Sequence, residues 1–158
     1  MSTAYNLTEI RQGGAHDLPA VATIMHEAFD PRYGEAWTTA QCMGMLSLPG
    51  AWLTLARHGD GDAGFALARS TGIDAELLLL AVRPRARGRG VGGALLRSVI
   101  AEARLRGSED IHLEVRAGNE AVRLYLREGF LKVGERRGYY RGRHGHLFDA
   151  LTYSRKIG

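Results

Sequence analysis

The chain has 158 residues and a formal net charge of +4, and 45% of its residues are hydrophobic and 24% charged. This length and composition exclude a disordered chain and argue against a second domain, since one core can form from a chain of this size. The longest apolar run, 77–82, is too short to cross a bilayer and the one cysteine excludes an internal disulfide, so we expect a single cytoplasmic domain over residues 1–158.

The N-terminal part of the chain predicts a strand followed by two helices. Residues 7–12 predict a short strand, and the apolar residues of HDLPAVATIMHEAF recur at helical spacing behind Asp17 as an N-cap. The Asp-Pro pair at 30–31 ends this helix. A second helix follows, from a threonine cap at 38 or 39 to about residue 48.

The rest of the chain predicts three strands and then alternating helices and strands. AWLTLARH and AGFALARS are joined by GDGD, a turn sequence typical of a β-hairpin, and ELLLLAV is the third strand. A helix begins in the glycine-rich segment and ends at Gly107, IHLEV follows as a strand, and a short helix spans about 119–128. Two strands between Phe130 and about Lys156 complete a mixed α/β fold: about seven strands in one central sheet, flanked by about four helices.

The segment RPRARGRGVGG fits two phosphate-binding patterns. Gly88, Gly90 and Gly93 match the Gly-x-Gly-x-x-Gly of dinucleotide-binding domains, and Glu114 lies 21 residues beyond Gly93. That pattern needs its first glycine at the end of the strand, whereas five residues separate Val82 from Gly88. No repeating βαβ array accompanies it either, which argues against a dinucleotide.

The second pattern is Arg-x-x-Gly-x-Gly, formed by Arg87, Gly90 and Gly92. Backbone N–H groups at the N-terminus of a helix can converge on a pyrophosphate, and the helix dipole favours the negative charge. Glycines let the backbone approach closely, and Arg85, Arg87 and Arg89 add positive charge. This pattern favours coenzyme A.

Two longer segments carry a family resemblance. AELLLLAVRPRARGRGVGGALL followed by LEVRAGNEAVRLYLREGF resembles the core of the GNAT superfamily of N-acetyltransferases. The LEVR strand, the LY pair and the basic double-tyrosine segment ERRGYYRGRHGHLFDALTYSRKI are most similar to the RimI-type ribosomal-protein alanine N-acetyltransferases. The resemblance runs from about residue 7 to 157. It implies the GNAT fold, acetyl-CoA as cosubstrate, and direct acetyl transfer to a protein N-terminal α-amine without a covalent enzyme intermediate.

The resemblance also implies a site in which strand 76–82 splays away from strand 111–116, leaving a gap for the pantetheine arm. Glu114 corresponds to the general base, acting directly or through water, and Glu76 is the alternative base because other acetyltransferases carry a glutamate on that strand. Tyr125 corresponds to the acid that protonates the coenzyme A thiolate, and the N–H of Val82 polarises the thioester carbonyl. The residues expected to bind the cofactor are Ala81, Val82, Arg87, Gly88, Arg89, Gly90, Val91, Gly92 and Asn119.

The sequence departs from the family pattern at two places. The spacing from Asn119 to Tyr125 is one residue shorter than usual, so either Asn119 is displaced or its helix starts differently. Leu79 stands where relatives often carry Asn or Thr, which removes a polar contact to substrate or cofactor.

The acceptor can be argued partly from proton energetics. An α-amine has a pKa near 8 and lysine one of about 10.4, so neutralising lysine costs roughly 3 kcal/mol more at neutral pH, and a single glutamate suits the α-amine. By resemblance, the loop DPRYGEAW and the double tyrosine wall a peptide groove, and acidic residues in the loop suit a basic N-terminus such as that of a ribosomal protein. The residues expected to bind substrate are Tyr33, Glu35, Trp37, Tyr139 and Tyr140.

Other functions stay open at the level of sequence. A small-molecule amine or a lysine is an alternative acceptor, and a basic nucleic-acid-binding module is the alternative outside enzymes. The arginines gather at 83–89 and 136–143 rather than along a helix with interleaved aromatics, so we expect no stable nucleic-acid binding and no membrane binding. The chain can be a monomer or a homodimer.

The remaining histidine and cysteine residues predict no further chemistry. His58, His144 and His146 lack the spacing of a metal site, and we expect no metal. Cys42 lies on the apolar face of the second predicted helix, where it fills the core rather than acting as a nucleophile.

Overall fold

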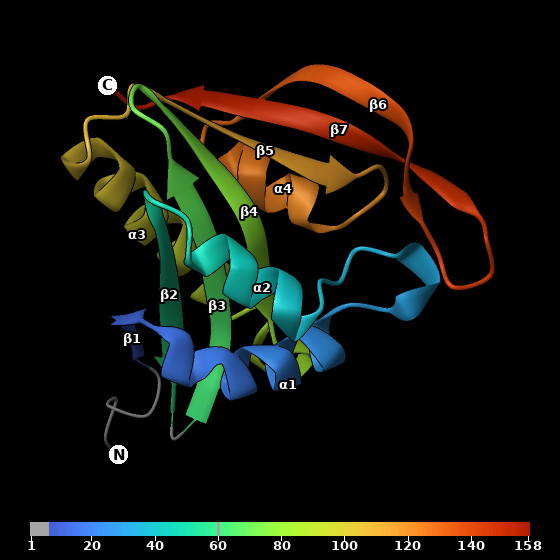
Figure 1. Ribbon diagram of the computed structural model, residues 1–158, viewed down its shortest axis with the longest axis horizontal. Coiled ribbons are helices and arrows are strands. Elements are labelled where there is room, and N and C mark those ends of the chain that lie inside the picture. The colour runs from blue at the N-terminus through green and yellow to red at the C-terminus, as the bar shows by residue number, and fades with distance from the viewer. Residues whose placement is uncertain (1–6, 60) are drawn as a thin grey trace.

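The computed structural model describes residues 7–59 and 61–158, which form one mixed sheet covered by helices on both faces (Figure 1). In these ranges seven strands lie in the order β1-β2-β3-β4-β5-β7-β6. The strands are β1 (Thr8–Gly13), β2 (Ala51–His58), β3 (Gly61–Ser70), β4 (Asp74–Val82), β5 (Asp110–Arg116), β6 (Leu131–Arg141) and β7 (Leu147–Lys156). The α-helices are α1 (Leu18–Ala28), α2 (Thr39–Leu46), α3 (Val91–Leu105) and α4 (Ala121–Arg127). Short 3-10 turns are η2 (Ala15–Asp17), η3 (Pro31–Tyr33) and η4 (Pro84–Ala86).

This order of strands and α-helices confirms the sequence prediction. Neighbouring strands are antiparallel except β4 and β5, which are parallel and joined through α3. A mixed sheet of this kind lacks the repeated parallel units of a dinucleotide-binding domain, so the dinucleotide pattern in the glycine loop is coincidental. No helix in the described ranges is long and apolar enough to span a membrane.

The sheet separates two apolar layers. On one face α3 and α4 pack through side chains that include Leu95, Val99 and Tyr125. On the other face α1 and α2 pack with Ile24, and Cys42 is buried there as a core side chain. Figure 1 shows α1 and α2 in front of the sheet and α3 behind it.

A bulge interrupts the side-chain alternation of strand β4 halfway along the strand. The pairing of β4 with β3 shifts register, so that Leu67 lies opposite Leu79 while Ala68 lies opposite Leu77. This bulge turns Leu77 toward the α3 layer and Leu79 toward the α1 layer, although the two are only two residues apart. The pairing of β4 with β5 ends at Leu77 and Leu113. The rest of β4 therefore separates from β5, which confirms the expected gap between them.

The N-termini of the helices differ in how they are capped. Thr38 caps α2, accepting a hydrogen bond from the N–H of Gln41 at 3.1 Å. Asp17 precedes α1 as predicted, but its carboxylate accepts hydrogen bonds from Arg11 and from the N–H of Gly14 instead of capping α1. The intervening turn η2 places that carboxylate beside β1. The GDGD turn between β2 and β3 contains residue 60, which lies outside the described residues.

Candidate active site in the gap between β4 and β5

A cavity of about 780 Å³ lies where β4 and β5 separate. Four segments contribute to its wall: the end of β4, the glycine loop with the start of α3, the segment from the end of β5 into α4, and the connection between α1 and α2. Each predicted part of the coenzyme A site except the side chain of Arg89 contributes to this wall. The lining includes Ala81, Val82, Arg87, Gly88, Gly90, Val91, Gly92 and Asn119.

The glycine loop presents its backbone to this cavity. Gly88 and Gly90 have φ values of 76° and 82°, a conformation that favours glycine, and a Cβ at either position would meet no atom within 4 Å. Gly90 precedes α3, and the first bond of the helix runs from the N–H of Ala94 to the oxygen of Gly90 at 3.0 Å. The N–H groups of Val91 and Gly92 therefore have no acceptor within the helix, and they suit an anion.

The backbone of β4 offers a further donor. Arg83 donates its N–H to the oxygen of Ala63 on β3 at 2.8 Å. Because N–H groups alternate in direction along a strand, the N–H of Val82 points away from β3 and into the gap. A carbonyl oxygen in the gap could accept this hydrogen bond, which fits the predicted role of Val82.

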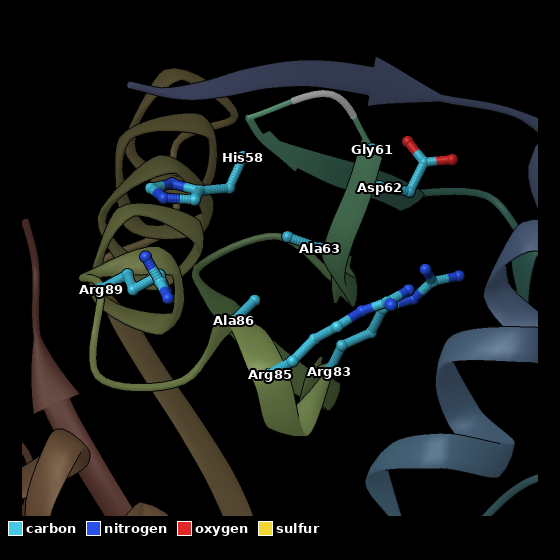
Figure 2. A pocket seen from close by; sticks show the side chains of 8 residues that line it. All are labelled: His58, Gly61, Asp62, Ala63, Arg83, Arg85, Ala86 and Arg89. Atoms are coloured by element: carbon cyan, nitrogen blue, oxygen red, sulfur yellow. The ribbon is translucent and has the colours of Figure 1, made fainter. Parts of the chain in front are cut away.

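The arginine side chains of the loop do not all face this cavity. Arg87 donates to the oxygens of Val82 at 3.2 Å and Ala28 at 3.0 Å, so its guanidinium ties the loop to β4 and α1. Arg89 turns into a second cavity on the other side of the loop, together with Arg85 (Figure 2). The arginines that line the first cavity are therefore Arg87, Arg116, Arg123 and Arg127, and not Arg89.

The connection between α1 and α2 closes the mouth of the gap through a buried ion pair. Glu35 accepts from Arg116 at 2.9 Å with one carboxylate oxygen and from Asn119 at 2.8 Å with the other, and its side chain is 9% exposed. The guanidinium of Arg116 lies 3.6 Å from the centre of the Tyr33 ring. Asn119 also accepts from the N–H of Ala121 at 2.8 Å, so it holds the start of α4 despite the short spacing to Tyr125.

The same connection is also joined to the β6–β7 hairpin. The N–H of Arg143 donates to the oxygen of Pro31 at 3.1 Å, and the rings of Tyr33 and Phe148 meet edge to face at 5.2 Å. Gly34 has a φ of 69°, and a Cβ there would overlap the carbonyl oxygen of Arg141. We call residues 30–35 the strap, since they link the gap to the hairpin.

Glu114 lies on β5 with His112 and Arg116 on the same face, as the alternation of the sequence predicts. Its carboxylate accepts from the hydroxyl of Thr152 at 2.7 Å and pairs with Arg136 at 3.0 Å. The Glu114 side chain is 13% exposed, whereas that of Arg136 is 63% exposed. An amine can therefore reach Glu114 by displacing the exposed side chain of Arg136 or through a water molecule.

Tyr125 and Tyr140 bring protonated phenols toward this region. Burial raises the pKa of Tyr125, and the charge of Glu35 raises it further. Burial also raises the pKa of Tyr140, with smaller contributions from Glu35, Tyr139, Glu114 and Tyr125. Tyr140 is thus coupled electrostatically to both predicted catalytic side chains, and both phenols keep their protons at neutral pH.

Other predicted residues lie elsewhere. Glu76 faces His112, where β4 and β5 are still paired, five residues or about 16 Å along the strand from Ala81. Trp37 packs against the apolar layer of α1 and α2 and is outside the lining described for the cavity. Tyr139 is 51% exposed and meets Tyr140 edge to face with ring centres 4.9 Å apart.

Sequence reasoning missed two arginines at this site. The LEVR motif contains Arg116, but its partner Glu35 is 81 residues away, and only the fold brings them together. Arg136 stood in a basic run, and nothing in that run predicted its contact with Glu114. The acidic loop residues are also neutralised, because Glu35 is paired with Arg116 and Asp30 with Arg32.

In the described part of the chain no three His, Cys, Asp or Glu side chains are placed to hold a metal ion.

Comparison with known proteins finds the same family at the level of sequence. Residues 49–132 match the model of the acetyltransferase (GNAT) domain. The N-alpha-acetyltransferase RimI of Mycobacterium tuberculosis is 36% identical over 129 residues, which cover 78% of this chain and 78% of that protein. The ribosomal protein bS18 alanine N-acetyltransferase of Salmonella typhimurium is 40% identical over 99 residues, covering 62% of this chain and 66% of that protein.

The fold has a close counterpart among solved structures. The crystal structure of the ribosomal-protein-S18-alanine N-acetyltransferase from Escherichia coli superposes with a TM-score of 0.84 at 29% identity. The match covers 96% of this chain and 95% of that one. These similarities confirm the resemblance inferred from the glycine loop and the LEVR segment.

Proposed function

Since the chain belongs to the GNAT family of acetyltransferases, we propose that it acetylates a protein N-terminal α-amine, with an alanine-initiated ribosomal protein as the acceptor. The observation that carries this proposal is the cavity at the gap between β4 and β5, which has an anion-binding backbone in its wall, with Glu114 on the adjoining part of β5 that is no longer paired with β4. The names of the relatives support the choice of acceptor, because they act on ribosomal protein alanine.

The residues at the first cavity fit acetyl-CoA, the cosubstrate of the family. The open backbone at Gly88 and Gly90 and the free N–H groups of Val91 and Gly92 suit a pyrophosphate. The N–H of Val82 can donate to a thioester oxygen in the gap. Acetyl-CoA supplies the acetyl group as a thioester, which is activated toward attack by an amine.

Proton transfer is assigned to two side chains. Glu114 accepts a proton from the attacking amine, directly or through water, as the new nitrogen–carbon bond forms. Tyr125 donates a proton to the sulfur as the carbon–sulfur bond breaks. A tyrosine phenol is protonated at neutral pH even at its ordinary pKa, so Tyr125 carries a proton that it can donate.

The acceptor side is closed by the strap rather than by free acidic groups. Because Glu35 is occupied by Arg116 and Asn119, it acts on an incoming peptide through the position of the strap. The exposed ring of Tyr139 and the half-buried Tyr140 can contact the peptide from the hairpin. We therefore expect the free amine and the small first side chain, rather than downstream charge, to select the acceptor.

Mass spectrometry of an acetylated peptide tests this proposal. A basic peptide that begins Ala-Arg and contains one internal lysine is incubated with the protein and acetyl-CoA. The proposal predicts one added acetyl group on the N-terminal alanine, and none on the same peptide when its N-terminus is blocked by formylation. Acetyl on the lysine of either peptide would identify a lysine acetyltransferase instead. An unmodified peptide, with acetyl-CoA still raising the melting temperature, would point to a small-molecule acceptor.

A further inference from the structure

A second cavity lies on the other side of the glycine loop and has no part in the proposed acetyl transfer. It has a volume of about 450 Å³ and is formed by η4, the loop after it and the facing ends of β2 and β3 (Figure 2). Its lining and that of the first cavity have Ala86 in common. The loop therefore separates two pockets, one on each side.

Three of the eight described residues that line the second cavity are arginines. Arg83 and Arg85 extend side by side from η4 and the residue before it, and Arg89 lies near His58 (Figure 2). Asp62 is the acidic side chain among the described residues of the lining. Three arginines around a hollow of this size give it a strong positive potential.

One acidic side chain outside the lining, Glu27, neutralises one of the three arginines. Glu27 pairs with Arg83 at 3.2 Å. The charge of Asp62 acts on Arg11, whose pKa is raised mainly by its hydrogen bond to Asp17 and in smaller part by Asp62. The other two arginines of the lining, Arg85 and Arg89, share it with the single carboxylate of Asp62, so the described lining keeps a net positive charge.

Neither of these two arginines has a partner of its own. In ranges 7–59 and 61–158, no hydrogen bond or ion pair is made by the side chain of Arg85 or of Arg89. His58 shares a hydrogen bond with the hydroxyl of Thr8 through Nδ1 at 3.0 Å, which leaves Nε2 for another partner. Two guanidinium groups and an imidazole nitrogen are thus available at one hollow surface.

We propose that this second cavity binds the phosphoryl group of a small anionic ligand, separately from acetyl-CoA. Guanidinium groups bind phosphoryl oxygens through paired hydrogen bonds, and a cavity of about 450 Å³ has the size of a small-molecule site. Arg83 and Arg85 lie on one side of the hollow and Arg89 lies with His58 on the other, so the cationic groups surround one hollow instead of following a surface (Figure 2). This arrangement suits a compact phosphate compound better than a nucleic-acid backbone.

Titration with inorganic phosphate tests the proposal. The protein is first saturated with coenzyme A, which fills the first cavity, and phosphate binding is then followed by ³¹P line broadening at constant ionic strength. Arg85→Ala removes one free guanidinium of the second cavity. Arg137→Ala is the matched control, since Arg137 is an exposed arginine of β6 outside the lining of both cavities.

The expected result is saturable phosphate binding that Arg85→Ala weakens at least fivefold and Arg137→Ala leaves within twofold. Equal weakening by both variants, or no saturation, would overturn the proposal. Phosphate binding that is seen in a parallel titration without coenzyme A but is absent from the saturated protein would also overturn it, because phosphate would then occupy the first cavity. If Arg85 is needed for RNA binding while phosphate binding is not saturable, the proposal is wrong and the cavity belongs to a nucleic-acid-binding surface. No acetyl acceptor is present, so the outcome is independent of the proposed acetyl transfer.

Discussion

The two ends of the gap between β4 and β5 differ in the groups that form them, which are backbone groups at one end and side chains at the other. The end formed by the glycine loop consists of backbone: positive φ values at Gly88 and Gly90 and free N–H groups at the start of α3. The acceptor end consists of side chains from distant parts of the chain. There Glu35 meets Arg116 across 81 residues, and Glu114 meets Thr152 across 38.

This difference determines how each end responds to substitution. A backbone site depends on local conformation, so a change of side chain matters there only where it alters φ or blocks the approach of the ligand. A site made of paired side chains depends on each partner, because the loss of one leaves the other buried without compensation. Changes at the first end should therefore alter cofactor affinity, and changes at the second should alter turnover and acceptor binding.

Tyr125→Phe should give the largest effect. The variant keeps the ring, which packs edge to face on Phe130 with centres 5.9 Å apart, and removes the hydroxyl. Loss of a general acid predicts a fall in kcat of about 100-fold, with the Kd for acetyl-CoA unchanged. Steady-state kinetics and calorimetry measure the two constants. An unchanged kcat would remove Tyr125 from the acid role.

Glu114→Gln should follow, with a fall in kcat/KM of about 30-fold from the loss of the base. The amide can still accept a hydrogen bond from Thr152, so the fold should persist. Arg136→Gln is the matched control, because it removes the partner of Glu114 but leaves the carboxylate, and an arginine that is 63% exposed contributes little through an ion pair. A loss in Arg136→Gln as large as that in Glu114→Gln would show that the ion pair, not the base, is required.

Glu35→Gln tests how much the buried ion pair between the strap and Arg116 contributes to the stability of the protein. The guanidinium of Arg116, 12% exposed, would lose its carboxylate while keeping an amide as a hydrogen-bond partner. We expect a loss of about 2 kcal/mol in the free energy of unfolding, measured in urea. Glu102→Gln, which breaks the more exposed pair with Arg106, should cost less than about 0.5 kcal/mol. Equal losses in the two variants would contradict a special role for the buried pair.

Asp17→Asn should have the smallest effect, because it lies outside both ends of the gap. The hydrogen bond from Arg11 lowers the pKa of Asp17 to about 2, and the N–H of Gly14 adds to this. A lowered pKa means that the ionised carboxylate stabilises the fold above its unfolded pKa of about 3.9, and that this contribution is lost as the pH falls toward 2. Allowing for solvent screening at the half-exposed Arg11, we expect a cost of about 1 kcal/mol at pH 7.

The pH dependence of stability distinguishes the loss of the Asp17 charge from a loss of side-chain packing. The difference in unfolding free energy between Asp17→Asn and the parent should shrink steadily from pH 5 to pH 2, as followed by urea titration. A difference that stays constant over that range would assign the cost to the shape of the side chain instead of its charge.

The same contrast explains what the sequence could predict. The order of strands and helices and the glycine loop follow from local patterns, so Gly88, Gly90 and Val82 could be placed before the fold was seen. The partners of Glu35 and Glu114 could not, because no local pattern encodes a contact across dozens of residues. Arg89 shows the limit within a motif, since its position in the loop was predictable but the direction of its side chain into the second cavity was not.

Three glycines with positive φ provide the most direct test of the division between the two ends. Gly88, Gly34 and Gly72 have φ values of 76°, 69° and 91°, and they lie in the loop, in the strap and in a turn remote from the gap. Each is replaced by alanine, and the Kd for acetyl-CoA and the KM for an Ala-Arg peptide are measured for all three variants.

We predict that Gly88→Ala raises the Kd for acetyl-CoA about tenfold and leaves the peptide KM nearly unchanged, because the strained backbone is that of the cofactor loop. Gly34→Ala, whose Cβ would overlap Arg141, should raise the peptide KM and spare the Kd, while Gly72→Ala should change neither constant. If Gly34→Ala weakens acetyl-CoA as much as Gly88→Ala does, the two ends form one site and the division is wrong.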